Sequence, residues 1–285
     1  MRDPNVPESL EGWWILHRMF AVDRRAWDAL PEKRRNKYCV HAVDLVEHLR
    51  GSEDGDLGLT QIVGNKGDLM LTHYARTFDG LAYAQTLVDK LELRDFLDAR
   101  ASYVSVLELG LYDATGKIHA ELGDRGLAPQ SPEWIAGFDE LVRKQEENPH
   151  VGSRLWARIP QRRYACFYPM NKRRGEVQNW YLLGFDARAK MMSEHGVVGR
   201  SYHGRVTQVI SGSIGFDDFE WGVDLYADDP LVFKKLIYEM RFDEVSARYG
   251  EFGEFWAGLQ FSPEELGVFL DGDAIPQLNG STPSS

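Results

Sequence analysis

Four side chains able to do chemistry together lie in the second half of the chain. They are the phenol of Tyr168, the ammonium of Lys172, the imidazole of His195 and the amide of Gln208. Pro169 stops the strand ladder directly after Tyr168, so we expect the phenol at a strand end, where active-site groups project. A neutral imidazole can coordinate iron from one side of a flat cofactor. The set therefore predicts a site in this half of the molecule.

The imidazole of His195 also has a purely structural interpretation. Asp186 can cap a helix that Gly196 ends, which would place His195 at the negative end of the helix dipole as a stabilising residue. His73 and His203 are the closest rivals for a ligand role. The assignment of His195 therefore stays open on this evidence alone.

The amide of Gln208 lies on an otherwise apolar strand face. It alternates with Val206 and Ile210, so it is expected to point toward an apolar interior. A structural hydrogen bond to backbone would explain it, and so would a neutral donor facing a ligand. Trp221, on the next strand, is expected by default to pack in the core.

Composition places the chain among soluble globular proteins and limits its partners. It has 285 residues, 43% of them hydrophobic and 27% charged, with a formal net charge of −11. This charge repels nucleic acid. No apolar run approaches the roughly 18 residues of a membrane span, and the N-terminus lacks the apolar core of a secretion signal. We expect a cytoplasmic protein that binds no membrane, with Cys39 and Cys166 reduced and no zinc site.

Positive charge is concentrated in one stretch of this acidic chain. Its members are Arg158, Arg162, Arg163, Lys172, Arg173 and Arg174. Such a cluster can be a solvated loop. It can also be a receptor for a small molecule that carries several carboxylates or phosphates.

Periodicity predicts two series of elements with the same order: strand, helix, strand, strand, helix, strand. The first is expected at residues 12–20, 24–49, 59–63, 68–74, 80–97 and 102–109. The second is expected at residues 164–168, 186–195, 205–211, 219–226, 230–241 and 255–260. The segments 60–63 and 207–210, Thr-Gln-Ile-Val and Thr-Gln-Val-Ile, occupy equivalent places and echo a duplication.

We therefore predict an α+β fold in which two ferredoxin-like repeats within one chain pack their sheets together, with helices outside. The first module is expected at residues 10–111 and the second at residues 152–270. Residues 112–151 form a connector able to move, with a helical stretch from Pro132. Residues 271–285 are expected to be a disordered tail.

Five separated motifs carry a resemblance. They are Tyr168-Pro-Met-Asn-Lys-Arg-Arg174, Glu194-His-Gly-Val-Val-Gly-Arg200, Val206-Thr-Gln-Val-Ile210, Asp217-Asp-Phe-Glu-Trp-Gly222 and Tyr238-Glu-Met-Arg-Phe-Asp-Glu-Val-Ser-Ala-Arg-Tyr249. In this order they resemble the coproheme decarboxylases of the chlorite dismutase-like superfamily, strongly over residues 154–259 and more weakly over 12–109. Asn171 departs from the pattern, because relatives often have serine there, but the acid and base groups of the motif are unaffected.

The resemblance implies a dimeric α+β barrel within one chain and a ring-shaped homopentamer. It implies peroxide-dependent oxidative decarboxylation of Fe-coproporphyrin III (coproheme) to haem b through a tyrosyl radical, the last step of coproporphyrin-dependent haem biosynthesis. Substrate and redox cofactor are then one molecule. A substrate with four carboxylates also explains a cationic pocket in an acidic protein.

The resemblance also assigns roles to individual residues. His195 matches the proximal iron ligand, Tyr168 the radical tyrosine, and Lys172 the lysine beside the reacting propionates. Other matching positions lie near propionates (Arg154, Met170, Arg241 and Ser246), line or adjoin the pocket (Trp180 and Trp221), or are distal to the iron (Gln208).

Two other functions stay open at this point. A haem carrier or sensor could use the same pocket without chemistry. A chlorite dismutase is disfavoured, because those enzymes carry arginine where this chain has Gln208. The expected partners are the porphyrin and hydrogen peroxide, with transient contact to the coproporphyrin ferrochelatase.

Overall fold

The computed structural model describes residues 5–279 and has an α+β fold with antiparallel strands. Its first half consists of β1 (Ser9–Val22), α1 (Arg24–Asp28), α2 (Glu32–Gly51), β2 (Gly55–Ile62), β3 (Leu69–Ala75), α3 (Phe78–Asp89), the 3-10 helix η1 (Glu92–Phe96) and β4 (Leu97–Gly110). Three helices follow, namely α4 (Tyr112–Asp124), α5 (Pro132–Glu146) and α6 (Pro149–Leu155).

The second half repeats the order of the first. It consists of β5 (Tyr164–Lys172), η2 (Trp180–Leu182), α7 (Phe185–Ser201), β6 (Thr207–Gly212), β7 (Trp221–Ala227), α8 (Leu231–Met240), α9 (Glu244–Tyr249), β8 (Gly250–Phe252) and β9 (Trp256–Phe261). The short elements η3 (Pro263–Glu265) and α10 (Leu266–Asp271) complete it.

The strands of residues 5–279 form one sheet that closes on itself. Their order is β7-β6-β4-β1-β3-β2-β9-β5-β8, and β7 pairs with β5 as well as with β6. The short strand β8 pairs with the last three residues of β5, and the other eight strands make a closed ring. Neighbours within the first half are β4-β1-β3-β2, and within the second half β6-β7-β5-β9. A closed ring leaves no unpaired sheet edge between the halves.

The inward face of the ring joins the two halves through a buried polar pair. Nε2 of His17, on β1, lies 2.9 Å from Oδ1 of Asp224, on β7, and both side chains are buried. The imidazole also stacks on Phe167 of β5, with ring centroids 3.9 Å apart. Because these three strands come from both halves, this contact fixes how the halves face each other.

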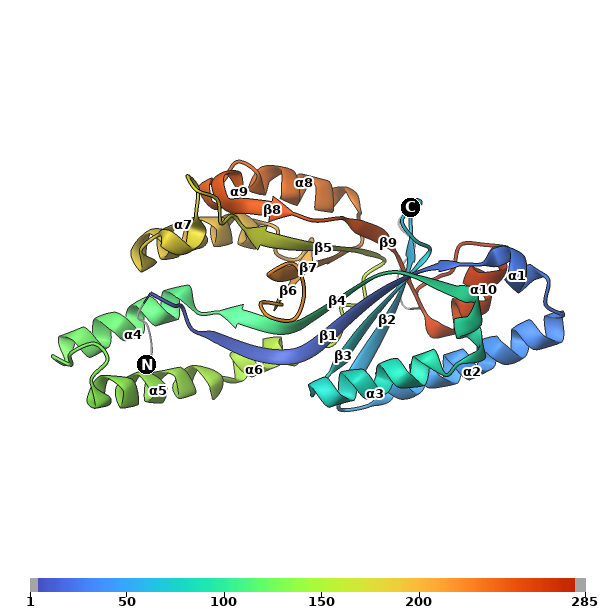
Figure 1. The fold of residues 1–285 in the computed structure, drawn as a ribbon, viewed down its shortest axis with the longest axis horizontal. Coiled ribbons are helices and arrows are strands. Elements are labelled where there is room, and N and C mark those ends of the chain that lie inside the picture. Colours follow the sequence, from blue (N-terminus) through green and yellow to red (C-terminus); the bar gives the residue numbers. More distant parts are fainter. Residues whose placement is uncertain (1–4, 280–285) are drawn as a thin grey trace.

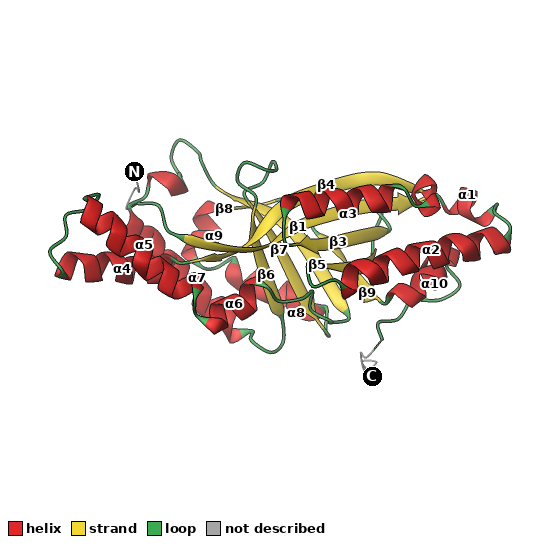
Figure 2. Cartoon of the chain, turned by 90° about the horizontal axis from the view of Figure 1, so that it is seen from below, coloured by secondary structure: helices red, strands yellow, loops and turns green. Residues whose placement is uncertain are grey.

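The outward face of the ring is covered by helices in both halves. In the first half Leu57 and Leu59 pack against α2 and α3 in one apolar cluster. In the second half Val223 and Leu225 pack against α8. Figure 1 shows α2 and α3 on one side of the strands and α7, α8 and α9 on the opposite side, and Figure 2 gives the view from below. Burial of each large apolar side chain contributes about 1.5–3 kcal/mol.

The predicted connector is largely helical. Only its second helix was expected from the sequence, and α4 and α6 were missed. Ile118 and Leu122 of α4 and Trp134 of α5 join the cluster that contains Trp13 of β1. This segment is therefore packed onto the end of the ring.

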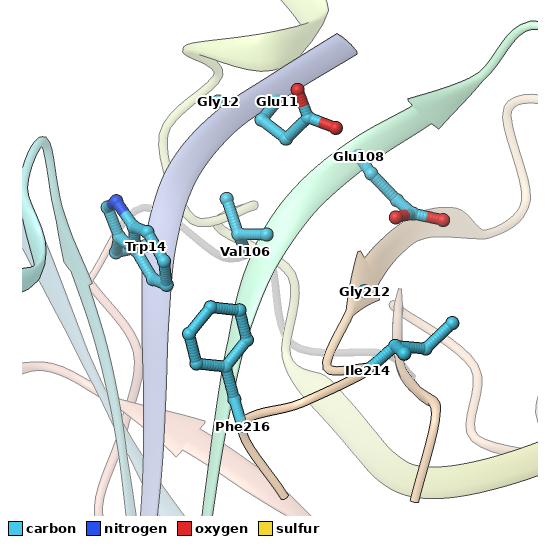
Figure 3. A pocket seen from close by; sticks show the side chains of 8 residues that line it. All are labelled: Glu11, Gly12, Trp14, Val106, Glu108, Gly212, Ile214 and Phe216. Carbon is cyan, nitrogen blue, oxygen red and sulfur yellow. The ribbon is translucent and has the colours of Figure 1, made fainter. Parts of the chain in front are cut away.

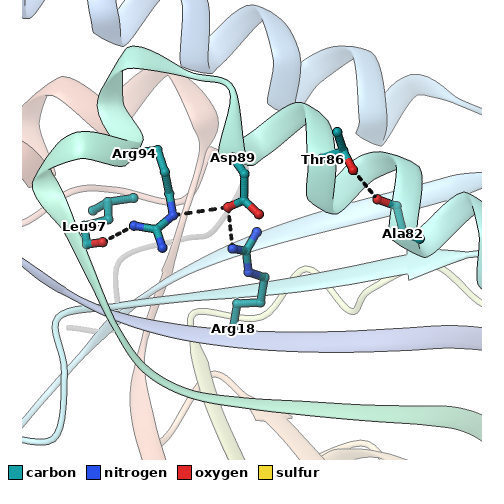
Figure 4. A network of polar contacts seen from close by, with 6 residues as sticks. All are labelled: Arg18, Ala82, Thr86, Asp89, Arg94 and Leu97. Atoms are coloured by element: carbon teal, nitrogen blue, oxygen red, sulfur yellow. Dashed lines mark hydrogen bonds and ion pairs between the residues drawn. The ribbon is translucent and has the colours of Figure 1, made fainter.

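Two predicted helices differ from what the periodicity indicated. The helix expected at residues 24–49 is divided at Pro31, which lacks an N–H and is extended (φ −58°, ψ 139°). The helix expected at residues 80–97 stops at Asp89. There the carboxylate Oδ1 accepts from Nη2 of Arg18 at 2.5 Å and from Nε of Arg94 at 3.1 Å, which fastens the turn to β1 (Figure 4).

The tail predicted to be disordered is packed in its first part. Leu278 is buried, and the N–H of Asn279 donates to Oγ of Ser262 at 2.8 Å. The rest of the predicted tail, residues 280–285, lies outside the described residues. Within residues 5–279, no helix combines the length and the apolar character that crossing a bilayer requires.

Candidate functional site

Strand register brings four of the predicted residues to one outward face of the second half. Across β5 and β7, Tyr168 is opposite Val223 and Met170 is opposite Trp221. Across β6 and β7, Gln208 is opposite Leu225, which belongs to the same face as Val223. Alternation along each strand therefore places Tyr168, Met170, Gln208 and Trp221 on the face that α7 and α8 cover.

His195 lies within α7 and not at its end, which corrects the sequence interpretation. The helix begins after Gly184 and continues through Gly196 to Ser201, so Asp186 is not its cap and the C-terminal dipole does not explain the imidazole. A carboxylate holds the ring instead, because Nδ1 of His195 lies 2.8 Å from Oδ2 of Asp243.

The anchored ring presents its other nitrogen. Nδ1 of His195 donates to Asp243, and Nε2 has no hydrogen-bond partner among residues 5–279. Asp243 is itself fixed as the cap of α9, where Oδ1 accepts from the N–H of Ser246 at 2.8 Å. A carboxylate on one ring nitrogen sets the tautomer, orients the ring and makes the other nitrogen more basic. This is the arrangement found in metal-binding histidines.

Lys172 is a buried ammonium beside the same carboxylate. It is 7% exposed, and its Nζ lies 5.2 Å from the ring centroid of Trp180. Burial lowers the pKa of Lys172 to about 8, against the opposing effect of the nearby carboxylates of Asp243 and Glu220. No ion pair to this Nζ occurs among the described residues, so the charge is available to an anionic ligand.

The phenol of Tyr168 is buried among aromatic rings. It lies in the middle of β5 and not at a strand end as predicted, because the pairing with β7 continues through Pro169 to Met170. It stacks on Phe255 with centroids 4.5 Å apart and lies 5.8 Å from Phe252. Burial raises the pKa of Tyr168, while the charge of Arg241 acts in the opposite direction. The guanidinium of Arg241 lies over the ring of Phe252 at 4.1 Å. A phenol in these surroundings stays protonated at neutral pH.

Gln208 reaches across from the sheet to the histidine helix. Its Nε2 donates to the carbonyl of Gly199 at 3.4 Å. A Cβ at position 199 would lie 3.3 Å from this amide nitrogen and 3.4 Å from Cε of Met240. Glycine therefore permits the close approach here.

The remaining predicted residues differ in their relation to this group. Arg154 is exposed on α6, which packs on β1 and β4, and no contact joins it to the others among the described residues. Ser246 is buried and donates from Oγ to Asp243 at 3.3 Å, so it contacts the anchor of His195. Met170 packs at the edge of the apolar cluster. Trp221 donates from Nε1 to Glu108 of the first half at 2.9 Å.

The predicted cationic cluster is divided. Arg158 donates to backbone carbonyls of residues 50, 52 and 55, Arg162 pairs with Asp228 at 2.5 Å, and Arg163 donates to the carbonyl of Gln260. These three arginines hold loops together. The other three cations lie at the end of β5: Lys172 is its last residue, and Arg173 and Arg174 follow directly.

A surface pocket adjoins this face and does not coincide with it (Figure 3). It has a volume of about 370 Å³ and is lined by Glu11, Gly12, Trp14, Val106, Glu108, Gly212, Ile214 and Phe216. Glu108 connects it to the site through Trp221. The lining of this pocket includes no histidine.

Sequence reasoning missed Asp243, the anchor of His195. The two residues are 48 positions apart and lie on different helices, so no local spacing joins them. A local signal was that aspartate is a preferred N-cap residue, so Asp243 could begin a helix, but this does not point to His195.

The donor set fits an iron porphyrin that carries carboxylates. Nε2 of His195 can take the iron, and Lys172 and Arg241 provide charge for the acidic edge. All three lie around the same sheet face. Fold and donors thus define an α+β barrel protein in which an anchored imidazole, a buried ammonium and an exposed guanidinium lie around one sheet face.

Comparison with known proteins assigns this barrel. The chain belongs to the chlorite dismutase family, whose model matches residues 35–261. It is 40% identical over 276 residues to a Haloquadratum walsbyi protein named provisionally as haem-binding, covering 96% of this chain and 48% of that protein. The chain therefore spans about half the length of that relative.

Solved structures share this fold. A haem-binding protein from Thermus thermophilus superposes with a TM-score of 0.80 at 39% identity, covering 95% of this chain and 99% of that one. Chlorite dismutase from Candidatus Nitrospira defluvii, in complex with imidazole, has a TM-score of 0.68 at 18% identity, with 92% and 96% covered. At this identity the second likeness concerns the fold alone.

Proposed function

We propose that this chain is a coproheme decarboxylase. It would convert two propionates of Fe-coproporphyrin III to vinyl groups and so form haem b, with hydrogen peroxide as oxidant. For each vinyl group one peroxide accepts two electrons and becomes two waters, while the carboxylate leaves as carbon dioxide. The proposal is supported by the haem-binding relatives and by the five motifs shared with coproheme decarboxylases.

One observation carries this proposal above the others. The imidazole of His195, held through Nδ1 at 2.8 Å by Asp243, lies beside a buried ammonium that interacts with the same carboxylate. A buried ammonium without an ion pair is costly unless a ligand provides the anion. An iron ligand and an anion receptor at one place suit a metalloporphyrin whose edge bears carboxylates.

The residues of the chain would divide the work as follows. Nε2 of His195 binds the iron, and the Lys172 ammonium and the Arg241 guanidinium bind propionates. The bound iron porphyrin supplies the oxidising equivalents when it meets peroxide. The phenol of Tyr168 gives up its hydrogen and then takes hydrogen from the propionate, and the low-dielectric aromatic surroundings exclude water from it. Gln208 remains a neutral donor on the opposite side of the ligand.

The two alternatives differ in chemistry and not in binding. A haem carrier or sensor is compatible with the haem-binding names of the relatives. Chlorite dismutation is less well supported, because Gln208 is an amide where chlorite dismutases carry arginine. Neither alternative explains why a phenol is held among aromatic rings beside a cation.

We further propose the wider setting that the resemblance implies. The two halves would be ferredoxin-like repeats, supported by their neighbour orders β4-β1-β3-β2 and β6-β7-β5-β9. Residues 10–111 and 152–270 would be the two modules, with the helices of residues 112–151 between them. The protein would work in the cytoplasm as a homopentamer and receive coproheme from the coproporphyrin ferrochelatase.

One experiment separates these functions. The purified protein is loaded with ferric coproheme, treated with peroxide, and the porphyrin is analysed by mass spectrometry. A decarboxylase removes the mass of two carbon dioxide molecules. A carrier binds the porphyrin and returns it unchanged, and a chlorite dismutase releases oxygen when chlorite replaces peroxide.

A further inference from the structure

Glu220 is a buried carboxylate at the entrance to β7. Its Oε2 accepts from the backbone N–H of Lys172 at 2.9 Å, and its own N–H donates to Oδ1 of Asn171 at 2.8 Å. Its carbonyl accepts from the N–H of Ser213 at 2.8 Å. One residue thus joins the end of β5 to both strands of the β6–β7 hairpin.

The same carboxylate holds the segment that follows Lys172. Nε of Arg174 lies 3.7 Å from Oε1 of Glu220, which is only 9% exposed. Arg174 forms a β-bridge with Asn179, and the N–H of Trp180 donates to the carbonyl of Arg173 at 2.9 Å. Residues 173–180 therefore fold back as a hairpin loop that brings Trp180 against the ammonium of Lys172.

The charges of two carboxylates, Asp243 and Glu220, act on this ammonium, and both carboxylates are engaged elsewhere. Asp243 binds His195, and Glu220 binds backbone. Nearby cations are compensated in part, since Arg173 pairs with Glu251 at 3.2 Å. The Lys172 ammonium therefore has negative charge near it but no direct ion pair that a ligand would have to break.

We propose that Glu220 is the positioning residue for Lys172. It fixes the backbone of Lys172 and the hairpin loop that carries Trp180, and its charge keeps the buried amine protonated while leaving the ammonium free for a carboxylate. This inference deepens the proposed function and rests on it for the identity of the anion. The geometry of Glu220 and Lys172 does not depend on which anion binds.

The test measures Lys172 directly. Acetic anhydride labelling, followed by peptide mass spectrometry across pH, gives the midpoint at which the Lys172 amine becomes reactive. We expect a midpoint near pH 8 in the unchanged protein. In Glu220→Gln, which keeps a hydrogen-bond acceptor and removes the charge, the midpoint should fall by about half a pH unit.

Glu251→Gln is the matched control, because it removes a carboxylate from the neighbouring strand that pairs with Arg173. It should leave the midpoint unchanged. An unaltered midpoint in Glu220→Gln, or an equal fall in Glu251→Gln, overturns the proposal. If Glu220→Gln does not fold, Glu220→Asp keeps the charge on a shorter side chain. It should retain the midpoint and loosen the loop, seen as a shift in tryptophan emission; no shift would contradict the positioning role.

Coproheme binding separates this inference from the proposed function. Glu220→Gln should weaken coproheme binding about twofold at pH 8 and have no effect in a Lys172→Met background. If labelling shows the expected shift but coproheme does not bind, Glu220 positions Lys172 and the proposed function fails. If coproheme binds normally and the midpoint does not move, the positioning role fails and the proposed function stands.

Discussion

The two halves of the ring share an order of elements but use their first long helices, α2 and α7, differently. Each helix carries a histidine whose Nδ1 meets a carboxylate: His41 with Glu92 at 3.1 Å on α2, and His195 with Asp243 at 2.8 Å on α7. The first pair is open to solvent, with exposures of 43% and 39%; the second is partly buried, with exposures of 27% and 9%. Only the second lies next to a buried ammonium.

The sheet faces beneath these helices differ in the same way. In the first half Leu57 and Leu59 pack into a continuous apolar cluster. In the second half Lys172 and Gln208 interrupt the apolar surface, and Ile210 remains 38% exposed. One topology therefore serves as support in one half and as a candidate site in the other. Function resides in side chains placed on a fold and not in the fold itself.

The largest expected effect comes from exchanging the histidines. His195→Ala should alter the absorption spectrum of bound ferric coproheme and weaken binding on the order of a hundredfold, because the axial ligand is lost; this equals about 2.8 kcal/mol. His41→Ala should leave both quantities unchanged. An unchanged spectrum in His195→Ala would move the iron ligand to another residue.

The next effect concerns the charge of Lys172. Its pKa is lowered to about 8 in the folded chain, so the ammonium is present below that pH and lost as pH rises through it. Coproheme binding should therefore weaken above about pH 8. Lys172→Met should remove that pH dependence and about 2 kcal/mol of binding. A spectroscopic titration of coproheme binding measures this. Wild-type binding that stays constant between about pH 7 and about pH 10 would contradict this role.

A smaller effect follows from the anchor of His195. Asp243→Asn keeps a helix cap and removes the charge, so the fold should persist while coproheme affinity falls about tenfold. Asp23→Asn changes the equivalent kind of cap on α1 in the first half, where the carboxylate accepts from the N–H of Ala26. It should have no effect on binding. Equal losses in the two variants would assign Asp243 a structural role only.

The smallest effect lies in the first half. Asp89→Asn removes the carboxylate shared by Arg18 and Arg94, an exposed ion pair. Denaturant unfolding should show a loss of at most about 1 kcal/mol. Burial raises the pKa of Asp89, but the hydrogen bonds from Arg18 and Arg94 outweigh it and lower that pKa. The contribution of the ion pair to stability is therefore present above the pKa of the unfolded chain and is lost as the pH falls. A change in coproheme binding would contradict the division between the halves.

Sequence reasoning predicted the order of elements well, because alternating apolar residues mark strands and turn residues mark their ends. It failed where tertiary contacts override local rules. Gly196 was taken as a helix end, yet α7 continues, and the nearby Gly199 serves to admit Gln208 and Met240. Local propensity cannot reveal that a glycine is kept for close approach.

The candidate site was predictable only in part for the same reason. Strand periodicity placed Gln208 on an apolar face, but the common face with Tyr168 and Lys172 was not predicted, because Pro169 was taken to end the strand that β5 continues to Lys172. Asp243 and Glu220 could not be predicted, because their partners are 48 positions away in each case. The arginines at 158, 162 and 163 looked free for a ligand, but they bind carbonyls and Asp228, which charge counting does not reveal.

The most direct test compares the unchanged protein with Tyr168→Phe. Both are loaded with ferric coproheme and treated with peroxide, and the porphyrins are weighed side by side by mass spectrometry. The account predicts equal binding, loss of two carboxyl groups as carbon dioxide in the unchanged protein, and an intact porphyrin in the variant. An intact porphyrin in both proteins, or the same loss in both, would contradict it.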